Sequence, residues 1–560
     1  MIRVDRLFRL QRPSLDQAHQ RLSVLILLFA AGFLVVAGRA VDLGVFQYAG
    51  DPAAPVNPAE ADHRWQRAEI VDRRGEVLAT TVASQWLYAD PRRIQKPEET
   101  ALALAEILPG QTAGDILRRF RRPKEFVWIE HNLTPSQVAA VNALGEPGLN
   151  FKTGSLRLYP HGRLAAHALG YTGIDGEGLA GLEKFFDRRL TDPARLDEPL
   201  RLSLDLRVQH AATDELALAM DEFQAKGAVA LVMDVHSGEL LSLVSLPDYN
   251  ANRYATATPE QKRNRATYEI YEQGSALKAV TIAAALDAGL VRLDDRIDAT
   301  KPIRIAGYTI HDFHGQRRDL TVPEVFTYSS NIGSARLGDT LGAERQKRFF
   351  RQVGLLSPAD VEVTEVSAPR YPERWGRIHT MTASFGHGVS ISSVQLAQAM
   401  AAMVNGGRLQ PATLLADADR QGRHRGRQVI SPETSAVMRQ LMRVAVVKGT
   451  GSFADVPGYR VAGKTSTAEK PGQTGGYDHD RVLSSFTGVF PAETPRYLVF
   501  AMLDEPHGTE ATYQFAGGGW VAAPTVGKII ARIGPLLGVE PRPADQTFIR
   551  EAALLVQEKD

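Results

Sequence analysis

Cysteine is absent from the 560 residues of this chain. A disulfide framework, a thiol nucleophile and a cysteine-ligated metal site are therefore excluded. Charge of one sign is not in excess, since 65 Lys and Arg residues stand against 64 Asp and Glu residues. This balance gives no indication of nucleic acid binding. Internal repeats, a phosphate-binding loop and a convincing set of metal ligands are also missing, so neither a cofactor nor a metal is expected.

Long hydrophobic runs are scarce, and the single one lies near the N-terminus. Residues 22–38 read LSVLILLFAAGFLVVAG without a charge. A helix of this length reaches about 25 Å, near the lower limit for a membrane span. Five arginines precede the run, so the positive-inside rule places residues 1–21 in the cytoplasm and the remainder outside. The run is longer than the core of a signal peptide, and we expect an uncleaved, single-pass transmembrane helix.

The rest of the chain divides into segments of different pattern. Residues 39–66 are rich in proline and alanine and are typical of a linker. Residues 67–200 mix short elements, beginning with a hairpin over 67–91 and followed by short amphipathic helices. Residues 201–545 are more regular and form a second domain, and residues 546–560 are a C-terminal tail.

The second domain has strands at both of its ends. GAVALVMDVHSGELLSLVSLPD (227–248) predicts a hairpin of two apolar strands. Three more strands are predicted near the C-terminus, in YRVAGKTSTAEK, RVLSSFTGVFP and RYLVFAMLDEP, and a helix over 523–537 follows. A long helical stretch separates the two groups. This order predicts an α+β domain with one sheet built from both ends. A surface loop is expected over 470–480, and we hypothesise that it folds over bound substrate.

Three short motifs suggest acyl-transfer chemistry. GSALKAVT (274–281) places Ser275 and Lys278 on one helix face, near an N-terminus where free N–H groups favour negative charge. Alone, this pattern also fits a capped helix with a surface lysine. SSN (329–331) and GKTSTAE (463–469) follow in the order known for β-lactamases and penicillin-binding proteins. The order and the flanking blocks argue against coincidence.

Acyl transfer from an amide needs a nucleophile, a base, an acid and donors for the oxyanion. Ser275 is the candidate nucleophile and Lys278 the candidate base. Lys278 accepts a proton only when neutral, and burial beside the second cation Lys464 would lower its pKa. The other candidate roles are a proton relay to the leaving group by Ser329, contacts to Lys278 and substrate by Asn331, a carboxylate grip by Lys464, Thr465 and Thr467, and an oxyanion hole from the backbone N–H groups of Ser275 and Thr467.

The sequence around these motifs resembles the class B penicillin-binding proteins over nearly the whole chain. The similar blocks are RAEIVDRRGEVLA, GLAGLEKFFDRRL, RNRATYEIYEQGSALK and FGHGVSISSVQLAQAMAAMVNGG. YSSNIGSARL with LTVPEVF resembles the division-specific, FtsI-type members. Elongation-type members usually have S-x-D in place of S-x-N.

The resemblance implies a membrane anchor, a pedestal of the dimerisation type over 67–200, and a β-lactamase-like transpeptidase domain over 201–545. That domain would hold a five-stranded antiparallel sheet between helices. The implied activity is D-Ala-D-Ala transpeptidation of peptidoglycan stem peptides, with penicillin and other β-lactams acylating the same serine. Implied partners are a SEDS glycosyltransferase similar to FtsW and other division proteins. The implied location is the bacterial inner membrane, with a periplasmic or external catalytic domain.

Two residues depart from the family pattern. Ser466, which is expected among the substrate-binding residues with Thr465 and Thr467, stands where glycine is usual, and its side chain either faces away from the site or narrows it. Gln273 stands where proline is usual, which indicates a local change of turn. Three alternatives remain open: an elongation-type or sporulation-type paralogue, a β-lactam-hydrolysing or sensing protein, and a non-catalytic division scaffold.

Overall fold

The computed structural model describes residues 27–34, 36, 66–416, 426–472 and 476–543. No helix within these ranges is both long and apolar enough to cross a membrane. Residues 27–34 are helical. Of the predicted anchor, residues 22–26, 35, 37 and 38 lie outside the described residues, as do nearly all of the predicted linker and both predicted tails. The chain divides into two compact units, one containing Ala83–Gly154 and the other Arg64–Val82 with Ser155–Asp560.

The smaller unit packs short helices around the ends of strands. β2 (Val77–Ala89) pairs with β3 (Val127–Leu133) and with β4 (Leu149–Leu158). Thr134 begins a helix with a capping box, because its side chain and that of Gln137 each accept a backbone N–H of the other residue. The helices are α2 (Pro97–Ile107), α3 (Ala113–Phe120) and α4 (Pro135–Ala143), and their core includes Leu87, Leu104, Ile116 and Ile129.

The predicted hairpin over 67–91 is confirmed. β1 (Ile70–Val71) pairs antiparallel with β2. The carboxylate of Asp72 closes the turn, accepting the N–H of Arg74 at 2.7 Å and that of Glu76 at 3.0 Å. β1 also pairs in parallel with β5 (Leu200–Arg201). The predicted border between residues 200 and 201 therefore falls inside a short strand.

The larger unit contains the predicted five-stranded antiparallel sheet, in the order β16-β17-β18-β6-β7. Strands from the two ends of the domain meet at its centre, where β18 pairs with β6. β16 forms one edge of the sheet. The strands are β6 (Gly227–Asp234), β7 (Leu240–Leu246), β16 (Ala462–Pro471), β17 (Tyr477–Phe490) and β18 (Tyr497–Asp504).

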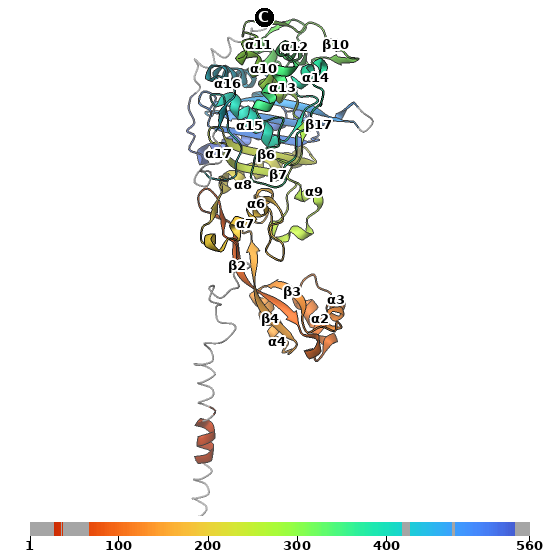
Figure 1. Cartoon of the computed structure of the whole chain (residues 1–560), viewed down its shortest axis with the longest axis vertical. Coiled ribbons are helices and arrows are strands. Elements are labelled where there is room, and N and C mark those ends of the chain that lie inside the picture. Colours follow the sequence, from red (N-terminus) through yellow and green to blue (C-terminus); the bar gives the residue numbers. More distant parts are fainter. Residues whose placement is uncertain (1–26, 35, 37–65, 417–425, 473–475, 544–560) are drawn as a thin grey trace, which may run out of the picture. The chain divides into compact units, whose positions relative to one another are not determined.

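Both faces of this sheet are covered by helices, so its strands are apolar on both sides (Figure 1). Along β6, Val229 and Leu231 belong to one core, whereas Ala230 and Val232 belong to the other. α8 (Leu206–Glu222) and α17 (Ala522–Leu536) contribute to the second core. The first core includes α10 (Leu277–Asp287), α15 (Ser393–Val404) and α16 (Pro432–Val447).

Shorter elements complete the larger unit. The helices are α5 (Ala166–Leu169), α6 (Gly181–Phe185), α7 (Asp187–Leu190), α9 (Pro259–Lys262), α11 (Val322–Thr327), α12 (Asn331–Leu341), α13 (Ala343–Gln352) and α14 (Arg377–Ala383). The strands are β8 (Tyr271–Glu272), β9 (Arg296–Asp298), β10 (Ile303–Ile305), β11 (Tyr308–Ile310), β12 (Asp319–Thr321), β13 (Ser390–Ile391), β14 (Arg408–Leu409) and β15 (Arg427–Gln428).

The predicted loop over 470–480 was wrong at its two ends. β16 extends to Pro471 and β17 already begins at Tyr477. Pairing continues past a register shift between Glu469 and Lys470, so the two strands form a longer ribbon than the sequence pattern indicates. Residues 473–475 lie outside the described part of the chain.

Candidate active site

Ser275 lies in a tight 3₁₀ turn, Gly274–Ala276, that leads directly into α10. Gly274 has a φ of +50°, a conformation that glycine adopts without steric cost. A Cβ at this position would also lie only 2.7 Å from the hydroxyl of Ser466. Glycine is therefore required both by the backbone and by the space. The nucleophile candidate precedes the first residue of the α-helix, while Lys278 is in its first turn.

The SSN motif forms the joint between two helices, as predicted. Ser329 ends α11 with a φ of +56°, and Ser330 begins α12 by accepting the N–H of Gly333 at 2.9 Å. A left-handed non-glycine residue costs about 1–3 kcal/mol and needs support from its surroundings. Asp312 gives that support, since its carboxylate accepts the hydroxyl of Ser330 at 2.8 Å and the N–H of Ile332 at 2.9 Å.

The hydroxyl of Ser329 is the centre of the polar site. Its Oγ lies 3.1 Å from Oγ of Ser275, and Nζ of Lys278 and Nζ of Lys464 each lie 3.0 Å from it. Hydrogen bonds thus connect the candidate nucleophile to both lysines through one side chain. The sequence predicted the meeting of these four residues, but assigned Ser329 only to the leaving group.

Lys278 is completely buried, and its pKa lies well below the usual lysine value because of burial and the neighbouring Lys464. Its Nζ donates to the backbone oxygen of Ser329 at 2.5 Å and to Oδ1 of Asn331 at 2.7 Å. A neutral amine has two N–H bonds for these two acceptors, which leaves its lone pair for Oγ of Ser329. This is the arrangement that a general base requires.

Lys464 is also buried, and burial lowers its pKa to about 7. Its Nζ donates to the backbone oxygen of Thr465 at 3.1 Å and lies 5.8 Å from the centre of the Phe326 ring. Within the part of the chain that the structure describes, neither Lys464 nor Lys278 has a carboxylate oxygen within 4 Å.

The K-T-S-T segment alternates between two environments, as side chains of a strand do. Oγ1 of Thr465 lies 2.5 Å from Oγ1 of Thr450, and Oγ1 of Thr467 accepts the N–H of Gly518 at 3.0 Å. Ser466 has the opposite orientation. Its hydroxyl donates to the backbone oxygen of Gln273 at 2.7 Å, so it contacts the turn that carries the nucleophile.

The backbone of Thr467 faces the same turn. Its carbonyl oxygen lies 3.1 Å from where a Cβ of Gly274 would be, on the open edge of β16. In an antiparallel ladder a residue directs its N–H and C=O to the same side. The N–H of Thr467 therefore also points away from β17, to the side on which the nucleophile turn lies; its part in an oxyanion hole stays a prediction.

Comparison with known proteins identifies the family. Residues 228–531 match the penicillin binding protein transpeptidase domain, and residues 64–191 match the penicillin-binding protein dimerisation domain. The chain belongs to the class B penicillin-binding proteins. The resemblance inferred from the motifs is thereby confirmed.

Relatives of this penicillin-binding protein cover most of its length. It is 40% identical, over 96% of this chain and 93% of the relative, to the "Probable peptidoglycan D,D-transpeptidase FtsI" of Caulobacter vibrioides. It is 31% identical to "Stage V sporulation protein D" of Bacillus subtilis, over 85% of this chain and 79% of that one. The crystal structure of penicillin binding protein 3 from Mycobacterium tuberculosis, complexed with ampicillin, matches with a TM-score of 0.69 and 25% identity, over 86% and 97% of the two chains.

Sequence reasoning missed several residues around the site of the penicillin-binding protein. Asp312 lies in the segment HDFH (311–314), and its carboxylate is the group that holds the SSN motif. Gly386 has a φ of +91°, and a Cβ there would lie 2.0 Å from the oxygen of Gly274. No local pattern marks either residue, because each acts on a partner distant in sequence.

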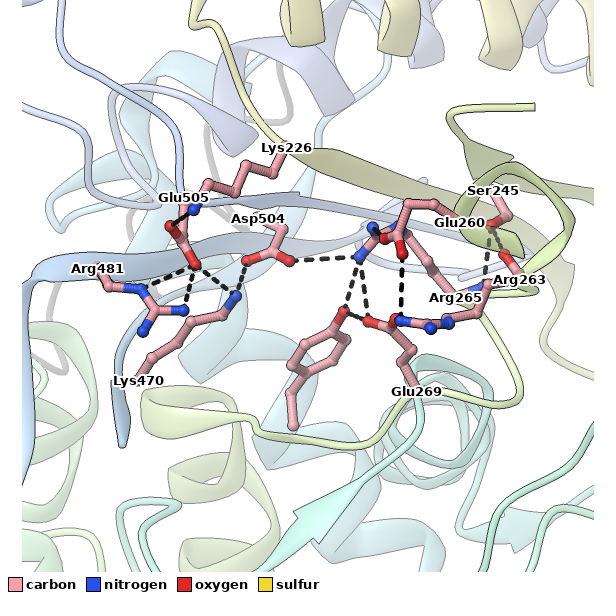
Figure 2. A network of polar contacts seen from close by, with 11 residues as sticks. Lys226, Ser245, Glu260, Arg263, Arg265, Glu269, Lys470, Arg481, Asp504 and Glu505 are labelled. Atoms are coloured by element: carbon pink, nitrogen blue, oxygen red, sulfur yellow. Dashed lines mark hydrogen bonds and ion pairs between the residues drawn. The ribbon is translucent and has the colours of Figure 1, made fainter. Parts of the chain in front are cut away.

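A network of paired charges holds the segment before the nucleophile to the sheet (Figure 2). Arg265 contacts Glu260, Glu269 at 3.1 Å and Asp504 at 3.3 Å, and Asp504 also pairs with Lys470. Glu505 continues the network; it pairs with Lys226 at 2.5 Å, Arg481 at 2.8 Å and Lys470 at 2.9 Å. The network therefore joins the ends of three strands to the chain that leads to Ser275.

Proposed function

We propose that this class B penicillin-binding protein is a serine-type D,D-transpeptidase that cross-links peptidoglycan stem peptides at the division septum and is a target of β-lactams. The observation that carries the proposal is the link from Ser275, through Ser329, to two buried lysines that have no carboxylate partner among the described residues. Such an arrangement favours removal of the hydroxyl proton at neutral pH, which activates a serine for attack on an amide.

In the acylation step, Oγ of Ser275 attacks the carbonyl carbon of the penultimate D-Ala. Its proton passes to Oγ of Ser329, whose own proton passes to the neutral amine of Lys278. The N–H groups of Ser275 and Thr467 donate to the oxyanion that forms. When the C–N bond breaks, the same path returns a proton to the leaving nitrogen, and D-Ala departs as a free amino acid.

In the second half-reaction, the amine of a neighbouring stem peptide attacks the ester carbonyl and loses a proton to the Ser329–Lys278 path. The ester bond breaks, Ser275 recovers its proton, and a new peptide bond joins the two stems. Lys464, Thr465 and Thr467 are proposed to bind the terminal carboxylate of the donor stem. A cation flanked by two hydroxyl donors suits that group.

We also propose that residues 22–38 anchor the protein in the inner membrane, with residues 1–21 cytoplasmic and the catalytic domain on the periplasmic or external side. The pedestal over 67–200, the transpeptidase domain over 201–545 and a partner similar to the SEDS glycosyltransferase FtsW belong to this proposal. The uncharged run and its arginine-rich flank support the anchor.

Fluorescent-penicillin labelling of the full chain in detergent tests the activity. We expect a stable covalent label that Ser275→Ala abolishes and that the exposed-site control Ser357→Ala retains. Rapid release of hydrolysed drug would instead indicate a β-lactamase. A folded wild-type protein that takes no label would indicate a scaffold without catalysis.

A further inference from the structure

The hydroxyl of Ser466 joins the two segments that carry the proposed oxyanion hole. It donates a 2.7 Å hydrogen bond to the carbonyl oxygen of Gln273, and Ser466 is only 3% exposed. Gln273 lies two residues before Ser275, and Ser466 lies directly before Thr467. We propose that Ser466 is a positioning residue that fixes the nucleophile turn on β16, so that the N–H groups of Ser275 and Thr467 point at one oxygen. This inference rests on the proposed function.

The turn is confined between two neighbours. On one side, a Cβ on Gly274 would lie 2.7 Å from Oγ of Ser466, 3.1 Å from the oxygen of Thr467 and 3.2 Å from Cβ of Ala468. On the other side, the backbone of Gly386 approaches the backbone of Gly274 closely. Van der Waals contact limits how near the turn and strand approach. Such contact has little directional preference, however, and does not stop the turn from shifting along β16. A directional hydrogen bond is needed to fix the turn in that direction.

Gln273 is held by hydrogen bonds of both its backbone carbonyl and its side-chain amide. Its carbonyl accepts the hydroxyl of Ser466, and its side-chain Nε2 donates to the backbone oxygen of Ile391 at 3.1 Å. Gln273 is also 3% exposed, so water does not replace either bond readily. The segment before the nucleophile is therefore tied to β16 on one side and to β13 on the other.

Because of the orientation of Ser466, the effect of its substitution can be distinguished from a loss of contacts to the substrate carboxylate. Its side chain points to the turn, whereas Thr465 and Thr467 present their hydroxyls on the other face of β16. Removal of the Ser466 hydroxyl should leave the proposed carboxylate grip intact. The loss should appear when the oxyanion forms, because donors that no longer converge lose more of their interaction with the transition state than with the ground state.

The test uses the full chain in detergent and measures the acylation rate at a series of fluorescent-penicillin concentrations. The dissociation constant of the non-covalent complex is thereby separated from the first-order acylation rate constant. For Ser466→Ala we expect the rate constant to fall by about 10- to 100-fold, with the dissociation constant within about twofold and an unchanged pH profile. Ser242→Ala is the matched control, because Ser242 is buried on β7 and its hydroxyl has no partner within the described chain.

Ser466→Cys replaces the hydroxyl by a somewhat larger thiol, which is only a weak S–H donor, and it serves if Ser466→Ala fails to fold. We expect the same loss of acylation rate with a thermal unfolding midpoint close to wild type. Wild-type rate constants in both variants, or a loss confined to the dissociation constant, would overturn the positioning role. If the wild type itself is not acylated, the proposed function fails first, and this result is distinct from the other two.

Discussion

The larger unit contains two clusters of charged side chains that are built in opposite ways. In the network of Figure 2, Arg265 and Lys470 face Asp504, and Glu505 faces three cations. At the active site, Lys278 and Lys464 are buried together and donate to neutral oxygens. Within the described residues, no carboxylate pairs with either of these two lysines.

The difference separates stability from chemistry. A buried cation with a carboxylate partner keeps its charge, and loss of one partner leaves the other unpaired at high cost. A buried cation without a carboxylate partner gives up its proton more easily, because only the charged form suffers from desolvation. The paired charges of the network therefore lie where the chain must stay in position, whereas Lys278 and Lys464 lie where a proton must move.

The largest effect is expected from Lys278→Met. Loss of the proposed base should lower the rate of penicillin acylation by about 10³-fold. The free energy of unfolding should stay level or rise, because the variant no longer has a lysine that must lose its proton when it is buried. Labelling kinetics and urea unfolding measure the two effects, with the exposed Lys528→Met as control. An acylation rate near wild type would remove Lys278 from the mechanism.

Arg265→Met should have the reverse profile. We expect the free energy of unfolding to fall by about 3–5 kcal/mol, since Glu269 and Asp504 would keep buried charge without this partner. Acylation per folded molecule should fall far less than in Lys278→Met. The half-exposed neighbour Arg263→Met is the matched control. Equal unfolding midpoints for the two variants in urea would show that burial of the network contributes little.

Lys464→Met tests how burial of Lys464 makes the free energy of unfolding depend on pH. Burial lowers the pKa of Lys464 from 10.5 to about 7. Between these values the unfolded chain binds more protons, so wild-type stability should rise with pH by up to about 1.4 kcal/mol per unit. The stability gained in this way is complete above pH 10.5 and is lost as the pH falls to about 7. The advantage of Lys464→Met over wild type should therefore shrink between pH 7 and pH 9 in urea unfolding. Parallel curves would contradict the shift.

The smallest effect is expected from Lys226→Ala, at the exposed end of the network. The lysine side chain is 62% exposed, and its partner Glu505 keeps Arg481 and Lys470. The free energy of unfolding should fall by less than about 1 kcal/mol. A fall in the free energy of unfolding as large as that of Arg265→Met, measured in urea, would mean that the contribution of an ion pair in this network does not depend on its exposure.

Most of the fold and the residues of the site can be predicted from short patterns in the sequence. The apolar run GAVALV and the turn at Gly238 predict β6 and β7, and the three motifs name the residues that meet around Ser329. These features depend on residues a few positions apart, whose geometry the backbone dictates.

What the sequence did not reveal depends on distant partners. Ser466 and Gln273 are 193 positions apart, and Arg265 and Asp504 are 239 apart. The left-handed backbone of Ser329 likewise depends on the hydrogen bonds that Asp312 accepts from the following residues Ser330 and Ile332, because serine alone does not favour this conformation. Such contacts follow from the completed tertiary structure and have no local signature.

The central pairing of the main sheet bears on how the protein is made. β6 ends at Asp234, and the residue that pairs there, Tyr497, comes about 260 residues later. At about 5–20 residues per second, the ribosome needs tens of seconds to reach it. During that interval the apolar edge of β6 has no native neighbour, and loop closure over such a distance is slow. The nascent chain must therefore avoid association through this edge until β18 has been synthesised.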